Sequence, residues 1–237
     1  MTNVLIPGGR DVRATLDRAE ASDASDAAGA KVDPEAVNGS ASDPTPDHDS
    51  DVTTGADAVV VACPPHPKQG GNRSDGRVRT VSDALVERGI DCLRFDYGAW
   101  DEGYGETADA DNAVAWALDR YDRVGLFGFS FGGCVALVTA ASRPELDAVC
   151  ALAPTARLNP DLDAVESLVA IADHDIRALV VYATRDTTAD WEPVVDRAAR
   201  VGVDTIGIDG DHFLVGRETD AARPITQFFN RTLVDTD

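Results

Sequence analysis

The segment VGLFGFSFGG, residues 124–133, decides how the rest of this sequence is interpreted. Its first half is apolar and typical of a buried strand, and an amphipathic run follows Ser130, which lies between Gly128 and Gly132. This is the pattern of a nucleophile elbow, G-x-S-x-G, in which a strained turn lifts the hydroxyl toward a base and backbone donors. A Cβ at either glycine would crowd the turn. The segment predicts Ser130 as a catalytic nucleophile, the alternative being an ordinary turn serine.

The chain beyond the elbow supplies an acid and a base in the order that such a site requires. Two later strand-like runs, 178–183 and 203–208, end near Asp186 and His212 respectively. The chain has four histidines, and only His212 follows a late strand. We therefore expect His212 to accept the serine proton and Asp186 to orient the imidazole. Because carboxylates are frequent in this chain, Asp190 remains an alternative acid, and His212 could instead be an ordinary loop histidine.

With these residues the sequence resembles the α/β-hydrolase superfamily, in particular small prokaryotic hydrolases related to dienelactone hydrolase. The run PHPKQGG, residues 65–71, is similar to the H-P-H-P-x-x-G-G segment that such proteins carry after an early core strand. The resemblance spans residues 57–237, with a weaker likeness in residues 1–20. It departs at Pro64, which replaces the first histidine of that segment, and at Ser130, where dienelactone hydrolases use cysteine. The second departure argues against that specific activity.

Strand-like and helix-like runs alternate after residue 57, as a parallel α/β sheet requires. We expect the α/β-hydrolase fold, a mostly parallel, doubly wound sheet of about eight strands with helices on both faces. Residues 1–20 would add N-terminal strands, and residues 57–237 would form the catalytic core. The segment between the strand-like runs 146–153 and 178–183 has room for one or two short helices, so no large cap domain is expected.

The bounds of one helix and the start of another are expected from local signals. A helix is predicted from about residue 107 to residue 121, after a loop that spans residues 96–105. Pro224 is expected to open the last helix, because its fixed φ suits a first helical turn.

The segment 21–56 differs in character from the rest of the chain. It is dominated by Ala, Ser, Asp, Gly and Pro and contains no Leu, Ile or Phe. Such a segment cannot bury enough apolar surface to offset the entropy of ordering it. We interpret it as a disordered acidic insertion, the alternative being a docking tail for a basic partner.

The charge balance constrains the partners. The chain has 42 acidic and 21 basic residues, with lysine only at positions 31 and 68. A net charge of -21 would repel nucleic acid and anionic membranes. Such a charge balance is typical of a protein from a high-salt cytoplasm, where salt reduces the Debye length to about 3 Å at 1 M and so screens the repulsion among the carboxylates. The alternative is an ordinary acidic protein.

No apolar run is long enough to span a membrane and no signal region is visible, so we expect a cytoplasmic protein. The cysteines fall in apolar runs without C-x-x-C or histidine at ligand spacing, so we expect buried thiols and no metal. These cysteines are Cys63, Cys92, Cys134 and Cys150.

An oxyanion hole requires two backbone N–H groups. One is expected from Phe131 and the other from His66, since the prolines around His66 have no N–H. The His66 ring could instead brace its loop. Lys68 could attract a substrate carboxylate. Aromatic residues near the nucleophile could line an acyl pocket or belong to the core: Tyr97, Trp100, Tyr104, Phe129 and Phe131.

The sequence thus predicts a serine hydrolase that cleaves a small ester, thioester or lactone through an acyl-enzyme, without a cofactor. A peptidase or amidase on the same scaffold is one alternative. A non-catalytic binding protein with this fold is another. The sequence does not indicate the oligomeric state.

Overall fold

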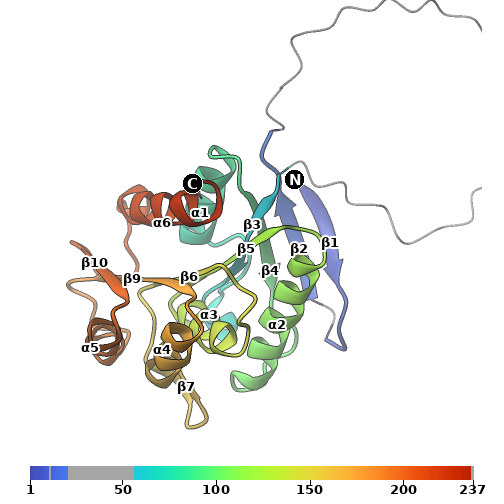
Figure 1. Cartoon of the computed structure of the whole chain (residues 1–237). Helices are drawn as coiled ribbons and strands as arrows, with labels where there is room; N and C mark the ends of the chain where they lie inside the picture. Colours follow the sequence, from blue (N-terminus) through green and yellow to red (C-terminus); the bar gives the residue numbers. More distant parts are fainter. Residues whose placement is uncertain (11, 21–55, 236–237) are drawn as a thin grey trace, which may run out of the picture.

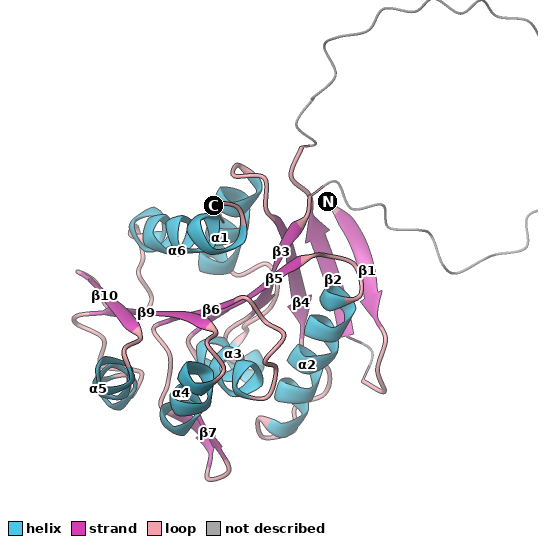
Figure 2. Ribbon diagram, in the orientation of Figure 1, coloured by secondary structure: helices cyan, strands magenta, loops and turns pink. Residues whose placement is uncertain are grey.

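An eight-stranded sheet runs through the computed structural model, which describes residues 1–10, 12–20 and 56–235 (Figures 1 and 2). The strand order is β1-β2-β4-β3-β5-β6-β9-β10. Every pairing is parallel except those that β2 makes with β1 and β4. The strands are β1 (Thr2–Ile6), β2 (Val12–Asp17), β3 (Ala58–Cys63), β4 (Asp91–Asp96), β5 (Arg123–Phe129), β6 (Ala148–Leu152), β9 (Arg177–Ala183) and β10 (Asp204–Ile208).

Helices cover both faces of the sheet, as the sequence predicted (Figure 2). One face carries α1 (Gly76–Val86) and α6 (Glu218–Leu233), which pack side by side. The other face carries α2 (Tyr104–Leu118), α3 (Phe131–Ala141), α4 (Ala164–Asp173) and α5 (Glu192–Val201). Each face therefore has its own apolar core, and the central strands read as continuous apolar runs because both of their faces are buried.

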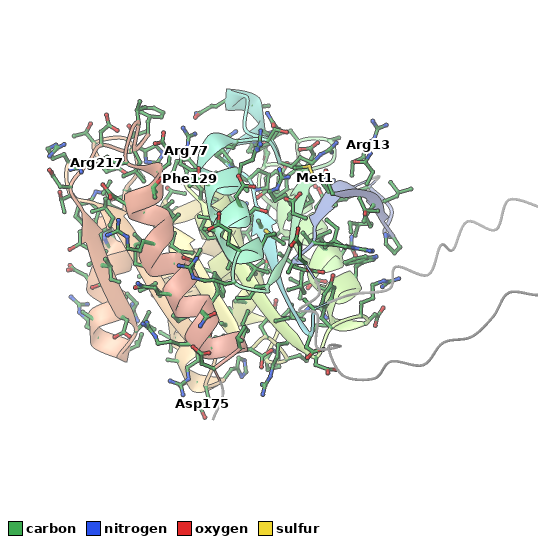
Figure 3. The ribbon with its side chains drawn as sticks, turned by 90° about the horizontal axis from the view of Figure 1, so that it is seen from above. Met1, Arg13, Arg77, Phe129, Asp175 and Arg217 are labelled. Carbon is green, nitrogen blue, oxygen red and sulfur yellow. The ribbon has the colours of Figure 1, made fainter. Side chains whose placement is uncertain are left out.

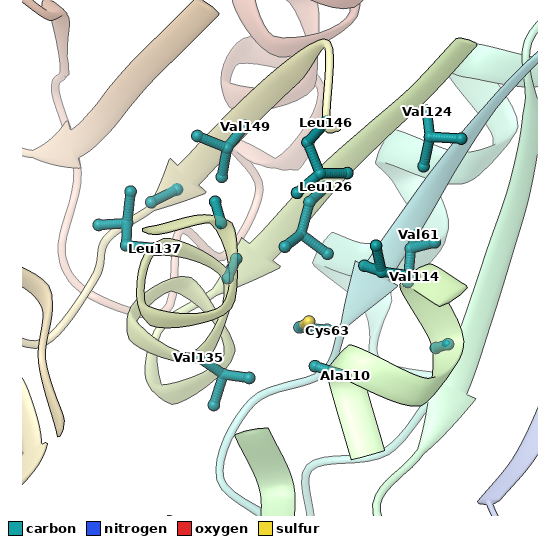
Figure 4. Close-up of a cluster of buried hydrophobic side chains, with 14 of the residues drawn as sticks. Val61, Cys63, Ala110, Val114, Val124, Leu126, Val135, Leu137, Leu146 and Val149 are labelled. Carbon is teal, nitrogen blue, oxygen red and sulfur yellow. The ribbon is translucent and has the colours of Figure 1, made fainter. Parts of the chain in front are cut away.

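The core under α2 and α3 holds the elbow strand in place. Leu126 of β5 packs there with Val61 and Cys63 of β3, and with Ala110 and Val114 of α2 (Figure 4). All of these side chains are fully buried. The carboxyl end of β5, where the elbow begins, is thus anchored by apolar contacts from both neighbouring elements.

The insert between β6 and β9 is small. It consists of a hairpin of β7 (Arg157–Asn159) and β8 (Leu162–Asp163), followed by α4. Within the described ranges no large cap domain covers the sheet, as expected.

The bounds of α2 and the start of α6 differ from the sequence predictions. Helix α2 spans Tyr104–Leu118. It begins earlier than its apolar pattern suggests, because the Glu106 side chain accepts the N–H of Gly103 and caps the first turn. Helix α6 begins at Glu218, so Pro224 lies inside the helix and does not open it. Helix α5 was not predicted, since only Val194 and Ala198 are buried in it.

The predicted disordered insertion 21–56 lies outside the described residues, apart from residue 56. No helix in the described part of the chain is long and apolar enough to cross a membrane. Among the described residues, no group of three or more His, Cys, Asp or Glu side chains could hold a metal ion.

The cysteines are buried and free, as predicted. Burial raises the pKa of Cys92 and Cys134 to about 12 and raises those of Cys63 and Cys150 further still. These thiols therefore remain protonated and behave as small apolar groups in the core.

Candidate active site

Ser130 lies at a sharp turn between β5 and α3. Its backbone has φ 58° and ψ -119°, in a region that residues with a side chain rarely adopt. The turn is held because the Ser130 N–H donates to the Leu152 carbonyl of β6 at 2.8 Å. A Cβ on Gly128 would overlap the Gly132 carbonyl, and a Cβ on Gly132 would overlap the carbonyl oxygens of Pro64 and Cys63. The elbow therefore needs glycine at both positions.

The side chains of Ser130, His212 and Asp186 form one hydrogen-bonded chain. His212 Nε2 lies 2.8 Å from Ser130 Oγ, and His212 Nδ1 lies 2.6 Å from Asp186 Oδ2. The carboxylate can only accept, so Nδ1 carries the ring proton and Nε2 is free to accept the serine proton. The His212 and Asp186 side chains are buried, whereas Ser130 is half-buried. This is the spatial arrangement of a serine nucleophile, its base and an orienting acid.

Backbone groups and an indole fix Asp186. Its Oδ1 accepts the N–H groups of Thr188 at 2.8 Å and Ala189 at 3.0 Å, and Trp191 Nε1 donates to its carbonyl at 3.1 Å. The Oδ2 atom is left for His212. The rival carboxylate, Asp190, is exposed on the edge of a separate surface cavity. Trp191 was not predicted from the sequence, because its contact with Asp186 depends on how the loop after β9 folds.

Aromatic and cationic groups support the His212 imidazole from behind. The Phe129 ring stacks on the His212 imidazole, with the two ring centroids 5.5 Å apart. The Arg77 guanidinium lies 4.7 Å from the centroid of the Phe129 ring (Figure 3). Phe129 is only 1% exposed. It therefore does not line an open pocket, contrary to one expectation from the sequence, because alternation along β5 turns Phe127 and Phe129 together toward α1 and α6.

Two backbone N–H groups near Ser130 are the candidates for an oxyanion hole. Phe131 is the first residue of α3, where an N–H has no partner within its helix. The loop that carries His66 packs directly against the elbow, as the crowding around Gly132 shows. Tyr97 fixes this loop by donating its hydroxyl to the Pro64 carbonyl at 3.1 Å. Among the described residues, neither the Phe131 nor the His66 N–H donates to a backbone acceptor.

Solved structures share this arrangement of strands and helices. XC6422 from Xanthomonas campestris, an α/β serine hydrolase without a lid, superposes with a TM-score of 0.71 at 21% identity, over 100% of this chain and 96% of its own. A dienelactone hydrolase from Anabaena variabilis gives a TM-score of 0.66 at 20% identity, over 98% and 97% of the two chains. Est1E from Butyrivibrio proteoclasticus gives 0.68 at 16% identity, over 97% and 98%.

This chain has the α/β-hydrolase fold.

Sequence comparisons match shorter parts of the chain. The X-Pro dipeptidyl-peptidase (S15) family matches residues 94–200, which include Ser130 and Asp186 but end before His212. The uncharacterized protein RP471 of Rickettsia prowazekii (strain Madrid E) is 29% identical over 106 residues. That match covers 40% of this chain and 44% of the relative.

An aromatic cluster borders Ser130 in this α/β-hydrolase fold. The His66 ring stacks on Trp100 at 4.6 Å, and both rings pack against Phe131, the residue after Ser130. Burial lowers the pKa of His66, and its Nδ1 accepts the Lys68 N–H, so the ring is neutral and braces its own loop. The Lys68 ammonium lies 5.0 Å from the Trp100 centroid. Trp100 and Tyr97 are partly exposed, whereas Tyr104 is exposed and donates to Asp161.

A cavity of about 960 Å³ lies at the other end of the sheet. Its lining includes Arg123 and Arg177, which begin β5 and β9, so it opens at the amino edge of the strands. Ser130 follows the carboxyl end of β5. In open α/β sheets the reactive groups gather at the carboxyl edge, so the surface around Ser130 and the partly exposed Trp100 is the candidate substrate site.

Proposed function

We propose that this protein is a serine hydrolase that cleaves a small ester, thioester or lactone through an acyl-enzyme intermediate on Ser130. The observation that carries the proposal is the hydrogen-bonded chain from Asp186 through His212 to Ser130 at a strained elbow. Strain at a residue that also faces a base is typical of a site built for reaction.

The geometry suggests how the reaction would proceed. Ser130 Oγ attacks the substrate carbonyl while His212 Nε2 takes the hydroxyl proton, and the N–H groups of Phe131 and His66 stabilise the oxyanion. His212 then gives the proton to the leaving alkoxide or thiolate as its bond to the acyl carbon breaks. Water, deprotonated by His212 Nε2, then attacks the acyl carbon. The bond between Ser130 Oγ and the acyl carbon breaks, the acid is released, and His212 returns the proton to Ser130 Oγ. Asp186 holds the imidazole in the required tautomer throughout.

Substrate size is inferred from the surroundings. The small insert between β6 and β9 leaves the site open, and the partly exposed rings nearby are those of Trp100 and Tyr97. An open face with a short apolar wall suits a small acyl group better than a long chain, which needs a tunnel to bury it.

Covalent labelling tests the proposal directly. A fluorophosphonate probe should label the wild-type protein at Ser130 and leave the Ser130→Ala variant unlabelled. The wild type should also hydrolyse p-nitrophenyl acetate and butyrate. A folded wild-type protein that neither labels nor turns over these esters would be a binding protein with this fold.

Peptide bond cleavage is a second candidate, because the X-Pro dipeptidyl-peptidase family matches residues 94–200. Both reactions would use the same serine, but an amide needs full protonation of its leaving nitrogen by His212. We expect p-nitrophenyl esters to be hydrolysed faster than Ala-Pro-p-nitroanilide. The opposite order would assign a peptidase.

A further inference from the structure

The loop of residues 97–103, between β4 and α2, carries the indole that borders the nucleophile. Trp100 is its aromatic tip and packs against His66 and Phe131. The loop has no regular secondary structure, so its shape must come from other contacts. These contacts determine where the wall of the candidate substrate site stands.

Two buried carboxylates of α2 hold the loop from beneath. Glu106 accepts the N–H groups of Asp101 at 3.0 Å and Gly103 at 2.8 Å. Asp109 accepts the Gly98 N–H at 2.8 Å. Both residues are 0% exposed, and burial raises the pKa of Asp109. A buried carboxylate needs a compensating cation, or it becomes protonated and loses strength as an acceptor.

Arg10 supplies that cation from the far end of the chain. It lies in the turn between β1 and β2, and its Nε donates to Asp109 Oδ1 at 2.8 Å. Its terminal nitrogen donates to the Ala99 carbonyl, inside the loop. The guanidinium rests on Gly105, where a Cβ would overlap it. Arg10 therefore bridges the helix that anchors the loop and the loop itself.

We propose that Arg10 is a positioning residue that, through Asp109 and the Ala99 carbonyl, holds the 97–103 loop and thereby sets the place of the Trp100 indole beside Ser130. The N-terminal hairpin thus determines which acyl groups the site accepts. The part of this inference that concerns acyl groups depends on the proposed esterase function. The part that concerns the loop does not.

The first test replaces the guanidinium with an uncharged side chain of similar length. In Arg10→Met, KM for p-nitrophenyl butyrate should rise about tenfold while kcat changes by less than about twofold, because the triad is untouched. For the acetate ester, which reaches less far along the wall, kcat/KM should change by less than about twofold. Arg13→Met is the matched control, since Arg13 is exposed on the same hairpin (Figure 3). It should behave as wild type.

Hydrogen–deuterium exchange measures the loop independently of turnover. Peptides that cover residues 97–103 should exchange faster in Arg10→Met than in wild type and in Arg13→Met, while peptides from β5 and α3 should keep their protection. An inactive wild-type protein with this exchange pattern would contradict the esterase and leave the loop assignment standing. Unchanged loop exchange in a folded Arg10→Met would overturn the inference.

Gly105→Ala tests the same contact without removing a charge. The added methyl must displace the Arg10 guanidinium, although alanine is the better helix former at this position in α2. Gly105→Ala should therefore raise KM for the butyrate ester while the net charge of the chain stays the same. In the Arg10→Met background the same change should have no further effect on KM. A full additive effect in the double variant would show that Gly105 acts without Arg10 and would overturn the inference.

Discussion

At the residue scale, Ser130 combines backbone strain with tight support from its surroundings. A residue with a side chain at φ 58° and ψ -119° costs about 1–3 kcal/mol, and it persists only where its surroundings fix it. Here the support comes from the Leu152 carbonyl and from backbone packing around Gly128 and Gly132. The strain keeps the Ser130 hydroxyl facing His212 at 2.8 Å. The support is backbone packing, so it does not depend on the serine side chain.

Removal of the proposed nucleophile, Ser130, or of its proposed base, His212, should therefore abolish activity without unfolding the protein. Ser130→Ala should lower kcat for p-nitrophenyl acetate by about 10⁶-fold, and His212→Ala should be comparably damaging, because the members of a triad act as a unit. Circular dichroism and the melting temperature check that each variant is folded. If either folded variant kept more than a few per cent of wild-type activity, the assignment of these two residues would fail.

The acid should be identified by the contrast between two neighbouring carboxylates. Asp186→Asn should lower kcat by about 10⁴-fold, because an amide at this position can favour the wrong imidazole tautomer. Asp190→Asn, on the exposed side of the same loop, should change kcat by less than about twofold. Steady-state kinetics on both variants decide the matter, and a larger loss in Asp190→Asn would reassign the acid.

At the element scale, α6 shows how packing overrides a local signal. Pro224 cannot donate to the Asp220 carbonyl and its ring crowds that turn, yet the helix continues from Glu218 to Leu233. Its apolar side chains Ile225 and Phe229 are fully buried against the sheet and α1. Burial of such side chains contributes about 1.5–3 kcal/mol each, which offsets the cost of about 3 kcal/mol for an interior proline.

Pro224→Ala should stabilise the protein. The substitution restores an N–H donor and removes the ring clash, and part of this gain is offset because the unfolded chain becomes freer. We expect the free energy of unfolding to rise by about 1 kcal/mol, measured by urea denaturation. Pro193→Ala is the control, since Pro193 lies in the first turn of α5, where proline fits without cost. Equal effects of both substitutions would contradict this explanation.

At the scale of the whole molecule, the two edges of the sheet differ. Asp17 at the end of β2 and Val60 near the start of β3 both lie opposite Cys92 of β4, so two strand spacings, about 10 Å, separate them. The carboxyl end of β2 and the amino end of β3 both lie at the amino edge of the parallel strands. Ser130, in contrast, follows the carboxyl end of β5. The chain between β2 and β3 thus leaves and re-enters the fold away from the candidate active site.

Deletion of residues 21–56 should therefore spare activity. A Gly/Ser linker of about six residues can reach from residue 20 to residue 57, since an extended residue spans about 3.3–3.6 Å. The variant should keep kcat/KM within about threefold of wild type, as expected for a change that touches no active-site group. A soluble, folded deletion variant without turnover would show that the segment reaches the active site.

The charge of the whole molecule leads to a prediction about salt. At net charge -21, repulsion among carboxylates opposes the compact state in dilute buffer. The Debye length shrinks from about 10 Å at 0.1 M to about 3 Å at 1 M, so added salt should relieve this repulsion. The melting temperature and the esterase activity should both rise between about 0.1 M and about 2 M KCl. A melting temperature that stays flat or falls would count against a salt-adapted protein.

The sequence alone was enough to predict the sheet, the helices on both faces and the absence of a large cap, because apolar runs and their spacing follow from local geometry. The order of Ser130, Asp186 and His212 along the chain also identified the three side chains that the structure brings together. Local signals were less reliable at helix ends. They misplaced the starts of α2 and α6, which depend on the Glu106 cap and on burial against α1.

Only the tertiary structure decided the surroundings of the site. Phe129 faces α1 and α6 behind His212, and Arg10 meets Asp109 across 99 residues of sequence. Such contacts depend on strand order, on which face of a strand a side chain occupies and on where a glycine leaves room. A single sequence carries no local pattern for them, since the energy of a buried charge pair comes from its three-dimensional environment.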